Sequence, residues 1–237
     1  MRNPALPDRA RISEIFSSLQ GEGPWIGCKH LFVRFEECHI HCQYCDELDK
    51  PAKWMSIDEV VSILNELNDK EVPHTHVSLT GGEPLIYLPF LKPLMLRLRD
   101  LNYRTYLETD GILSKPLGDV LDLCDVIAMD LKPASVTGEK SFLEDHRRFL
   151  QVAKHKDVFI KMVLSKSIDE KEFLELVSMT ADIHPDVTFV LQPLSDQIEG
   201  HDDPVLMKKL YDLQKLAARK LRRVSIVPRL HKILKLR

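Results

Sequence analysis

The sequence contains no apolar run long enough to cross a membrane, and its N-terminal stretch, MRNPALPDRARISEIF, lacks the apolar core of a signal peptide. A surplus of charge of one sign is also missing, because 33 Lys and Arg residues are balanced against 36 Asp and Glu residues. We therefore expect a cytoplasmic protein that contacts no membrane. The charge balance also argues against nonspecific binding of nucleic acid.

Low-complexity segments, short repeats and a linker that would divide the chain are absent from the sequence. Its 237 residues are enough for a sizeable core, and 44% of them are hydrophobic. We expect one domain, residues 1–237, with elaborations at its N- and C-terminal ends.

Seven short segments rich in β-branched and apolar residues recur along the chain. Several are almost continuously apolar, which is typical of strands that are covered on both faces. Helical patterns lie between most of them, and this alternation indicates an α/β fold with a parallel sheet that forms a barrel or partial barrel. The predicted strands are 30–36, 76–80, 104–108, 125–130, 158–164, 187–192 and 223–227.

Three of the predicted helices have recognisable signals. One begins at Ser56 with Glu59 three residues later, the spacing of a capping box. A second repeats that spacing with Ser167 and Glu170. A third, within residues 206–217, carries an apolar stripe at helical spacing and therefore predicts one buried face.

Cysteine is scarce, with five residues, yet Cys38, Cys42 and Cys45 lie within one short segment. The other two, Cys28 and Cys124, are separate from it. Disulfides are rare in a reducing compartment, so a metal or redox role gains weight for this C-x3-C-x2-C segment.

Thiolates are soft ligands that suit zinc or an iron–sulfur cluster. A structural zinc site normally takes four ligands, and because no second C-x2-C pair is present, His39 or His41 would have to complete it. A 4Fe–4S cluster held by three cysteines would instead leave one iron open for a ligand that reacts. From the residues alone, both interpretations and simple packing stay open.

Three further segments place polar residues directly after predicted strands: SLTGGEP (78–84), YLETDG (106–111) and MDLKPAS (129–135). Parallel barrels carry their active sites at the carboxyl ends of the strands, and adjacent glycines let a ligand approach the backbone closely. Each segment could equally be an ordinary turn. The candidate binding residues are Gly81, Gly82, Glu83, Glu108, Thr109, Lys132 and Ser135.

The C-x3-C-x2-C segment after a first strand, together with these strand-end segments, resembles the signature of radical S-adenosylmethionine enzymes. The resemblance implies a partial (β/α)6 barrel in which Cys38, Cys42 and Cys45 hold a 4Fe–4S cluster and S-adenosylmethionine occupies the open iron. It implies that the strand-end residues bind this cofactor and that a donor such as flavodoxin or ferredoxin reduces the cluster. An electron from the cluster then cleaves the sulfonium and yields a 5′-deoxyadenosyl radical.

Three longer segments resemble the 7-carboxy-7-deazaguanine synthase family: residues 14–38, LQP (191–193) and VPRLHK (227–232). The resemblance implies a homodimeric carbon–nitrogen lyase of queuosine and deazapurine biosynthesis. Such an enzyme converts 6-carboxy-5,6,7,8-tetrahydropterin to 7-carboxy-7-deazaguanine with loss of ammonia, while S-adenosylmethionine is regenerated and magnesium assists. The residues assigned to the substrate are Gln20, Glu22, Arg34, Gln192 and His231.

The sequence departs from this family's pattern after the last cysteine, where Glu47 stands in place of a threonine that helps to bind magnesium. A carboxylate is a good magnesium ligand, so we expect that Glu47 either binds the ion or replaces it by presenting a carboxylate to the substrate. ECH replaces GCN, and Arg229 replaces a glutamine. Two alternatives follow: a related radical enzyme, such as an activase that installs a glycyl radical on a partner protein, and a zinc-binding interaction module without catalysis.

Overall fold

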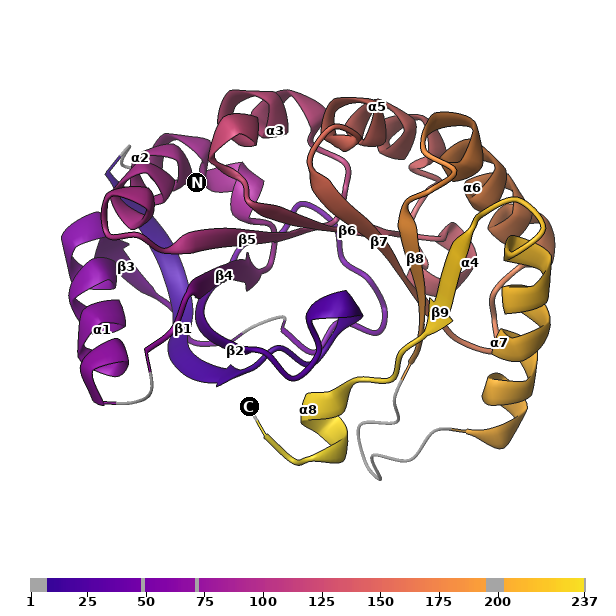
Figure 1. Cartoon of the computed structure of the whole chain (residues 1–237), viewed down its shortest axis with the longest axis horizontal. Coiled ribbons are helices and arrows are strands. Elements are labelled where there is room, and N and C mark those ends of the chain that lie inside the picture. Colours follow the sequence, from indigo (N-terminus) through magenta and orange to yellow (C-terminus); the bar gives the residue numbers. More distant parts are fainter. Residues whose placement is uncertain (1–7, 48–49, 71–72, 195–202, 237) are drawn as a thin grey trace.

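The computed structural model describes residues 8–47, 50–70, 73–194 and 203–236. Within them, one nine-stranded sheet has the order β3-β1-β2-β4-β5-β6-β7-β8-β9 and curves around a central space (Figure 1). Strands β2 and β4 to β9 are parallel, whereas β1 and β3 extend one edge in antiparallel pairing. The strands are β1 (Arg9–Leu19), β2 (Lys29–Phe35), β3 (Lys53–Ser56), β4 (His76–Gly81), β5 (Arg104–Thr109), β6 (Val126–Leu131), β7 (Asp157–Leu164), β8 (Thr188–Pro193) and β9 (Arg223–Ile226).

Six parallel strands, β2 and β4 to β8, are each connected to the next by a segment with a helix on the outside of the sheet (Figure 1). After β2, the short strand β3 precedes this helix. All seven predicted strands are confirmed, and the fold is the predicted partial (β/α)6 barrel with β9 as a seventh parallel strand. Within the described ranges, none of the helices is long and apolar enough to span a membrane. The six helices are α1 (Ile57–Lys70), α2 (Leu88–Asp100), α3 (Ser114–Val120), α5 (Leu143–Ala153), α6 (Glu170–Ile183) and α7 (Pro204–Ala217).

Residues along the parallel strands alternate between the two faces of the sheet. Leu79 and Leu107 belong to the main hydrophobic core, which also contains the buried residues of the covering helices. Their strand neighbours face the inside of the barrel, where Tyr106 and Phe159 form a second, smaller core against Trp25. Inward-facing side chains that lie nearer the carboxyl ends of the strands therefore pack on top of this inner hydrophobic core.

Both ends of the chain elaborate the barrel. Strands β1 and β3 were not predicted, because β1 mixes charged and apolar residues and β3 is a four-residue strand in a polar connection. At the opposite edge, β9 leads into the short helix α8 (Leu230–Ile233). The backbone N–H of Leu230 donates to the carbonyl of Gly21 at 2.9 Å, so the C-terminal segment lies against the loop after β1 (Figure 1).

The two predicted capping boxes have different outcomes. The first is confirmed, because the backbone N–H of Ser56 donates to Glu59 Oε2 at 2.7 Å and the Ser56 hydroxyl accepts from the Glu59 N–H at 3.3 Å. The second is wrong, because Asp169 caps α6 and accepts from the Glu172 N–H at 2.8 Å. An aspartate directly before the first helical residue satisfies the free N–H groups, and Ser167 bonds instead to a carbonyl outside the helix.

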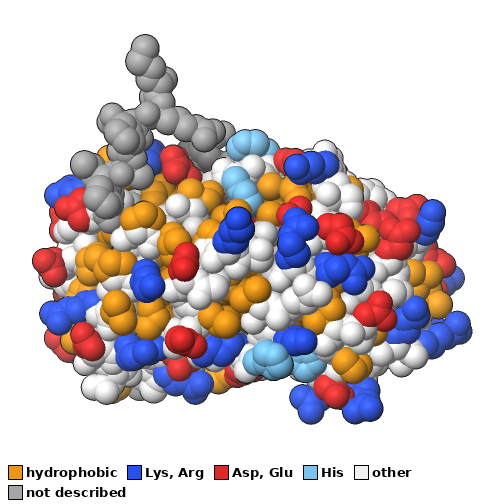
Figure 2. Space-filling view, turned by 90° about the horizontal axis from the view of Figure 1, so that it is seen from above, with side chains coloured by type: hydrophobic (Ala, Val, Ile, Leu, Met, Phe, Trp, Pro, Cys, Tyr) orange, Lys and Arg blue, Asp and Glu red, His pale blue; other side chains and the backbone are white. Residues whose placement is uncertain are grey.

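The outer surface carries charge of both signs. Figure 2 views the molecule from its helix-covered side, where basic and acidic side chains are interspersed with scattered hydrophobic ones. This mixture agrees with the nearly equal numbers of basic and acidic residues. A further group of charged side chains lies inside the barrel, at the carboxyl ends of the strands.

Candidate active site

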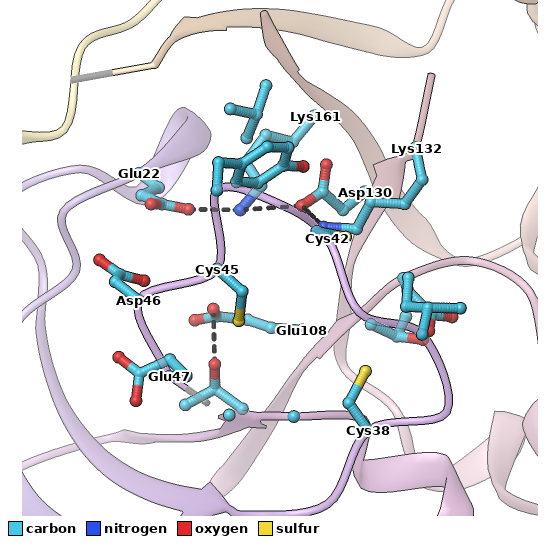
Figure 3. A pocket seen from close by; sticks show the side chains of 18 of the residues that line it. Glu22, Cys38, Cys42, Cys45, Asp46, Glu47, Glu108, Asp130, Lys132 and Lys161 are labelled. Atoms are coloured by element: carbon cyan, nitrogen blue, oxygen red, sulfur yellow. Dashed lines mark hydrogen bonds and ion pairs between the residues drawn. The ribbon is translucent and has the colours of Figure 1, made fainter. Parts of the chain in front are cut away.

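The clustered cysteines lie on the loop that follows β2, at the carboxyl ends of the parallel strands. Cys38, Cys42 and Cys45 line one cavity (Figure 3), and none of them forms a disulfide. The loop is fastened from outside, because the backbone N–H of Gln43 donates to the carbonyl of Thr137 at 2.8 Å. The three thiols therefore share one space that is open to a ligand.

This donor set fits a soft metal centre. Burial raises the pKa of the Cys38 thiol to about 12 and also raises the pKa of Cys42, so without a metal both thiols keep their protons, and a bound metal would have to displace them. Neither nearby histidine lines the cavity. His39 Nε2 lies 2.5 Å from Asp110 Oδ2, and His41 is exposed. The site therefore offers three sulfur donors without a histidine as fourth ligand.

The two glycines at the end of β4 make room for the start of the cysteine loop. Gly81 has a φ of +114°, and a Cβ there would lie 2.1 Å from the carbonyl oxygen of Phe35. A Cβ on Gly82 would lie 2.0 Å from the carbonyl oxygen of Glu37. Both glycines line the cavity, so the same backbone that supports the loop is within reach of a ligand.

Glu83 lies behind the cavity wall and is fully buried. Its carboxylate accepts hydrogen bonds from Thr109 Oγ1 at 3.0 Å, from the Asp110 N–H at 2.8 Å and from the Leu85 N–H at 3.0 Å. Burial and the neighbouring Asp110 raise the pKa of Glu83 well above its usual value. The side chain thus ties the end of β4 to the end of β5.

The other candidate residues at the strand ends also differ in whether they line the cavity. Glu108, Thr109 and Lys132 line the cavity, whereas Ser135 does not. Ser135 Oγ donates to Glu172 Oε2 at 2.6 Å and thereby joins the short helix α4 (Ala134–Thr137), which follows β6, to the start of α6.

Four charged side chains form a row across the inner face of the barrel (Figure 3), which we call the charged row: Glu22, Lys161, Asp130 and Lys132. Lys161 Nζ lies 2.5 Å from Glu22 Oε2 and 3.5 Å from Asp130 Oδ2. Lys132 Nζ lies 2.8 Å from the same Asp130 oxygen. Each side chain is at most 18% exposed, so opposite charges must compensate for lost hydration.

The row sets the ionisation of its members. Burial alone would raise the pKa of Glu22, but the ammonium of Lys161 lowers it to about 2. The carboxylates of Asp130 and Glu22 raise the pKa of Lys161 against the effect of burial. For the neighbouring Glu108 burial prevails, and its pKa is raised. Glu22 is therefore an anion at neutral pH.

Amide side chains surround the carboxylates. Gln20 Nε2 donates to Glu108 Oε1 at 3.0 Å, and Thr80 Oγ1 donates to the other oxygen of Glu108 at 2.8 Å. Gln192 Nε2 donates to Glu22 Oε1 at 3.0 Å. The carbonyl oxygen of the Gln192 side chain is buried and has no hydrogen-bond partner among the described residues. The Gln192 oxygen can therefore accept a hydrogen bond from a ligand in this part of the cavity.

A second cavity adjoins the first, and Glu22 lines both. Arg34 and His231 line the second cavity. Arg34 Nη1 lies 2.9 Å from Glu47 Oε1, and a Cβ on Gly21 would lie 2.0 Å from His231 Nδ1. The five residues that the sequence assigned to the substrate therefore surround two adjoining cavities.

The two carboxylates that follow Cys45 are each held by two basic side chains. These ion pairs fasten the exit of the cysteine loop to β2 on one side and to the C-terminal segment on the other. The N···O distances are 2.9 Å for Glu47 with Arg34, 2.7 Å for Glu47 with Lys50, 3.2 Å for Asp46 with Arg229 and 3.3 Å for Asp46 with Lys232.

Four further residues line the first cavity although the sequence did not predict them as site residues: Asp130, Lys161, Tyr44 and Asp46. A usable signal existed for the first two, because Asp130 is the one charged residue of β6 and Lys161 interrupts the apolar run of β7 that follows its first residue, Asp157. A charge at such a position is costly unless it is paired, so it points to a polar layer inside the barrel.

Comparisons with known proteins agree with this geometry. The sequence matches the Radical SAM superfamily over residues 32–180, and the chain belongs to that superfamily. Membership implies a 4Fe–4S cluster and S-adenosylmethionine as cofactors. The fold resembles the crystal structure of QueE from Escherichia coli, with a TM-score of 0.63 at 21% identity over 92% of this chain and 93% of that one.

Two relatives narrow the assignment. The 7-carboxy-7-deazaguanine synthase of Geobacter sulfurreducens is 33% identical over 95% of this chain and 97% of its own length. The enzyme of that name from Methanopyrus kandleri is 33% identical over 94% of this chain and 92% of its own length. The chain belongs to the 7-carboxy-7-deazaguanine synthase family, and the interpretation as a non-catalytic zinc module is set aside.

We predict that the anaerobically reconstituted protein binds about four irons per chain through its three clustered thiols. Replacing Cys38, Cys42 or Cys45 by Ala should abolish the cluster absorption and the bound iron. The matched controls Cys28→Ala and Cys124→Ala should retain both, since neither side chain lines the cavity. Iron and sulfide analysis with visible absorption measures this. Stoichiometric zinc without iron uptake would contradict it.

Proposed function

We propose that this protein converts 6-carboxy-5,6,7,8-tetrahydropterin to 7-carboxy-7-deazaguanine with loss of ammonia, as a carbon–nitrogen lyase of queuosine and deazapurine biosynthesis. One observation supports the proposal above all. Three free thiols, and polar side chains whose oxygens can accept hydrogen bonds from a ligand, line two adjoining cavities at the carboxyl ends of the strands. Similarity over nearly the whole chain to relatives of that name supports it.

Cys38, Cys42 and Cys45 would hold the cluster and leave one iron for the cofactor. Bound there, the cluster and S-adenosylmethionine supply a 5′-deoxyadenosyl radical. In this proposal Glu83 and Ser135 serve the cofactor site by holding the strand ends, since neither lines the cavity. The residues proposed to bind the cofactor from the cavity wall are Gly81, Gly82, Glu108, Thr109 and Lys132.

The pterin would be recognised by complementary hydrogen bonding. Its ring edge carries amine and amide N–H donors, which match the anionic Glu22 and the buried carbonyl oxygen of Gln192. Its carboxylate matches the guanidinium fork of Arg34. Gln20 and His231 complete the proposed substrate site.

Magnesium is proposed to bind at Glu47. Carboxylate oxygen is a ligand that this hard cation prefers. Glu47 is paired with Arg34 and Lys50, so the ion must replace one of these partners. Lys50 is the easier one to displace, because its side chain is 41% exposed whereas that of Arg34 is 19% exposed.

The family pattern also supports a homodimer that acts in the cytoplasm and takes electrons from a donor such as flavodoxin or ferredoxin. We propose no nucleic-acid or membrane partner, in keeping with the balanced charge of the sequence.

The proposed reaction is tested by anaerobic incubation of the reconstituted protein with S-adenosylmethionine, a reductant and the carboxypterin. We expect 7-carboxy-7-deazaguanine and ammonia, identified by mass spectrometry, with many turnovers for each S-adenosylmethionine consumed. Cys42→Ala is the inactive control. If the protein cleaved S-adenosylmethionine but neither bound nor consumed the pterin, a related radical enzyme with another substrate, such as a glycyl-radical activase, would replace this proposal.

Replacing Arg34 by Lys keeps a positive charge but removes the bidentate fork. Loss of a charge-assisted hydrogen bond, about 1.5–3 kcal/mol, should weaken pterin binding roughly tenfold to hundredfold. Iron content and reductive cleavage of S-adenosylmethionine should stay near wild type. Anaerobic titration measures the affinity, with the exposed Arg219→Lys as control. A parallel collapse of cofactor cleavage would place Arg34 in the cofactor site or the fold.

Replacing Glu47 by Thr restores the residue type of the family and offers magnesium one neutral oxygen in place of a carboxylate. The variant should stay active but need more magnesium for its half-maximal rate. Rates over a magnesium series, with a chelator as the lowest point, measure the difference. A wild type indifferent to chelator, with a variant that acquires a magnesium requirement, would mean that Glu47 replaces the ion. Identical curves would make Glu47 a bystander.

A further inference from the structure

Lys161 occupies a position that the fold alone would give to an apolar residue. It lies in β7 two residues after Phe159, which belongs to the inner hydrophobic core, and its side chain is only 13% exposed. A buried ammonium loses its hydration, so a well-packed apolar side chain would suit the same place at least as well for stability. The lysine therefore calls for a role other than holding the strand.

Its ammonium bridges two carboxylates that come from different parts of the chain. Glu22 belongs to the loop after β1, and Asp130 lies in β6. The contacts are 2.5 Å to Glu22 Oε2 and 3.5 Å to Asp130 Oδ2 (Figure 3). Because β7 and β6 are paired with Asp130 opposite Lys161, the rigid sheet fixes the lysine, and the lysine fixes Glu22.

The Glu22 carboxylate is held without being saturated. Lys161 binds one oxygen and Gln192 donates to the other. Each carboxylate oxygen can accept two hydrogen bonds, so among the described residues each keeps one acceptor site. Two parallel N–H donors on a flat ring edge could use these sites together.

We propose that Lys161 is a positioning residue for the substrate: it holds the Glu22 carboxylate as a fixed anion that receives the N–H edge of the pterin, and it does not touch the pterin itself. The inference rests on the proposed function. The other charged groups that face Glu22 are Glu108 on β5 and Arg229 and His231 in the C-terminal segment, with Asp130 and Lys132 further along the charged row.

The ionisation of Glu22 gives this role a pH signature. With Lys161 present, the pKa of Glu22 is about 2, so the carboxylate is an anion at neutral and mildly acidic pH. Without the ammonium, burial dominates and raises that pKa. The anionic fraction, and with it the affinity for the pterin, then falls as the pH is lowered toward the new pKa.

The test compares anaerobic pterin binding by reconstituted wild type, Lys161→Met and Lys161→Arg, with the exposed Lys171→Met as control. Lys161→Met should bind the pterin roughly tenfold to hundredfold more weakly than wild type. The ratio of its dissociation constant to that of wild type should grow as the pH is lowered from about 8 to about 6. Lys161→Arg should recover most of the affinity. Iron content and cleavage of S-adenosylmethionine should change less than about twofold in every variant.

Three results would overturn the inference: wild-type affinity in Lys161→Met, a pH-independent loss, or a loss of cofactor cleavage that matches the loss of pterin binding. If Lys161→Met does not fold, Glu22→Gln is compared with Glu22→Gln/Lys161→Met, in which both charges are removed. Equal pterin affinities support action through Glu22, and a further loss in the double variant contradicts it. A wild type that binds the pterin but forms no deazapurine would instead count against the proposed function.

Discussion

Burying several charges inside an apolar barrel is possible only where each charge has an opposite partner close by. The charged row meets this constraint by alternating carboxylate and ammonium groups over four side chains. Because its members come from the loop after β1, from β6 and its end, and from β7, satisfying the charges also fixes these elements relative to one another. Stability and site geometry thus depend on the same contacts.

The row connects the two halves of the site. At one end Glu22 faces the second cavity, with Arg34 and His231. At the other end Lys132 Nζ lies 5.7 Å from the centre of the Tyr44 ring, which belongs to the cysteine loop. The charged row thus links the cysteine loop to the second cavity through a continuous series of contacts.

The sequence predicted the parallel strands and the cysteine loop well, because apolar runs and closely spaced thiols are local signals. It missed β1 and β3, whose residues become strands only by pairing at the sheet edge. Glu83 and Ser135 were predicted from strand-end motifs, yet their side chains bond to neighbouring elements behind the cavity wall. The pairing of Lys161 with Glu22 joins residues far apart in the chain, and no local pattern could reveal it.

We propose that cluster, cofactor and pterin occupy one continuous space beside the charged row. Electron–nuclear double resonance on the reduced protein with S-adenosylmethionine and isotopically labelled carboxypterin measures how close they lie. We predict a coupling between the label and the electron spin of the cluster that disappears in Glu22→Gln. Tight binding of the labelled pterin to the wild type without any such coupling would place the pterin elsewhere and contradict the account.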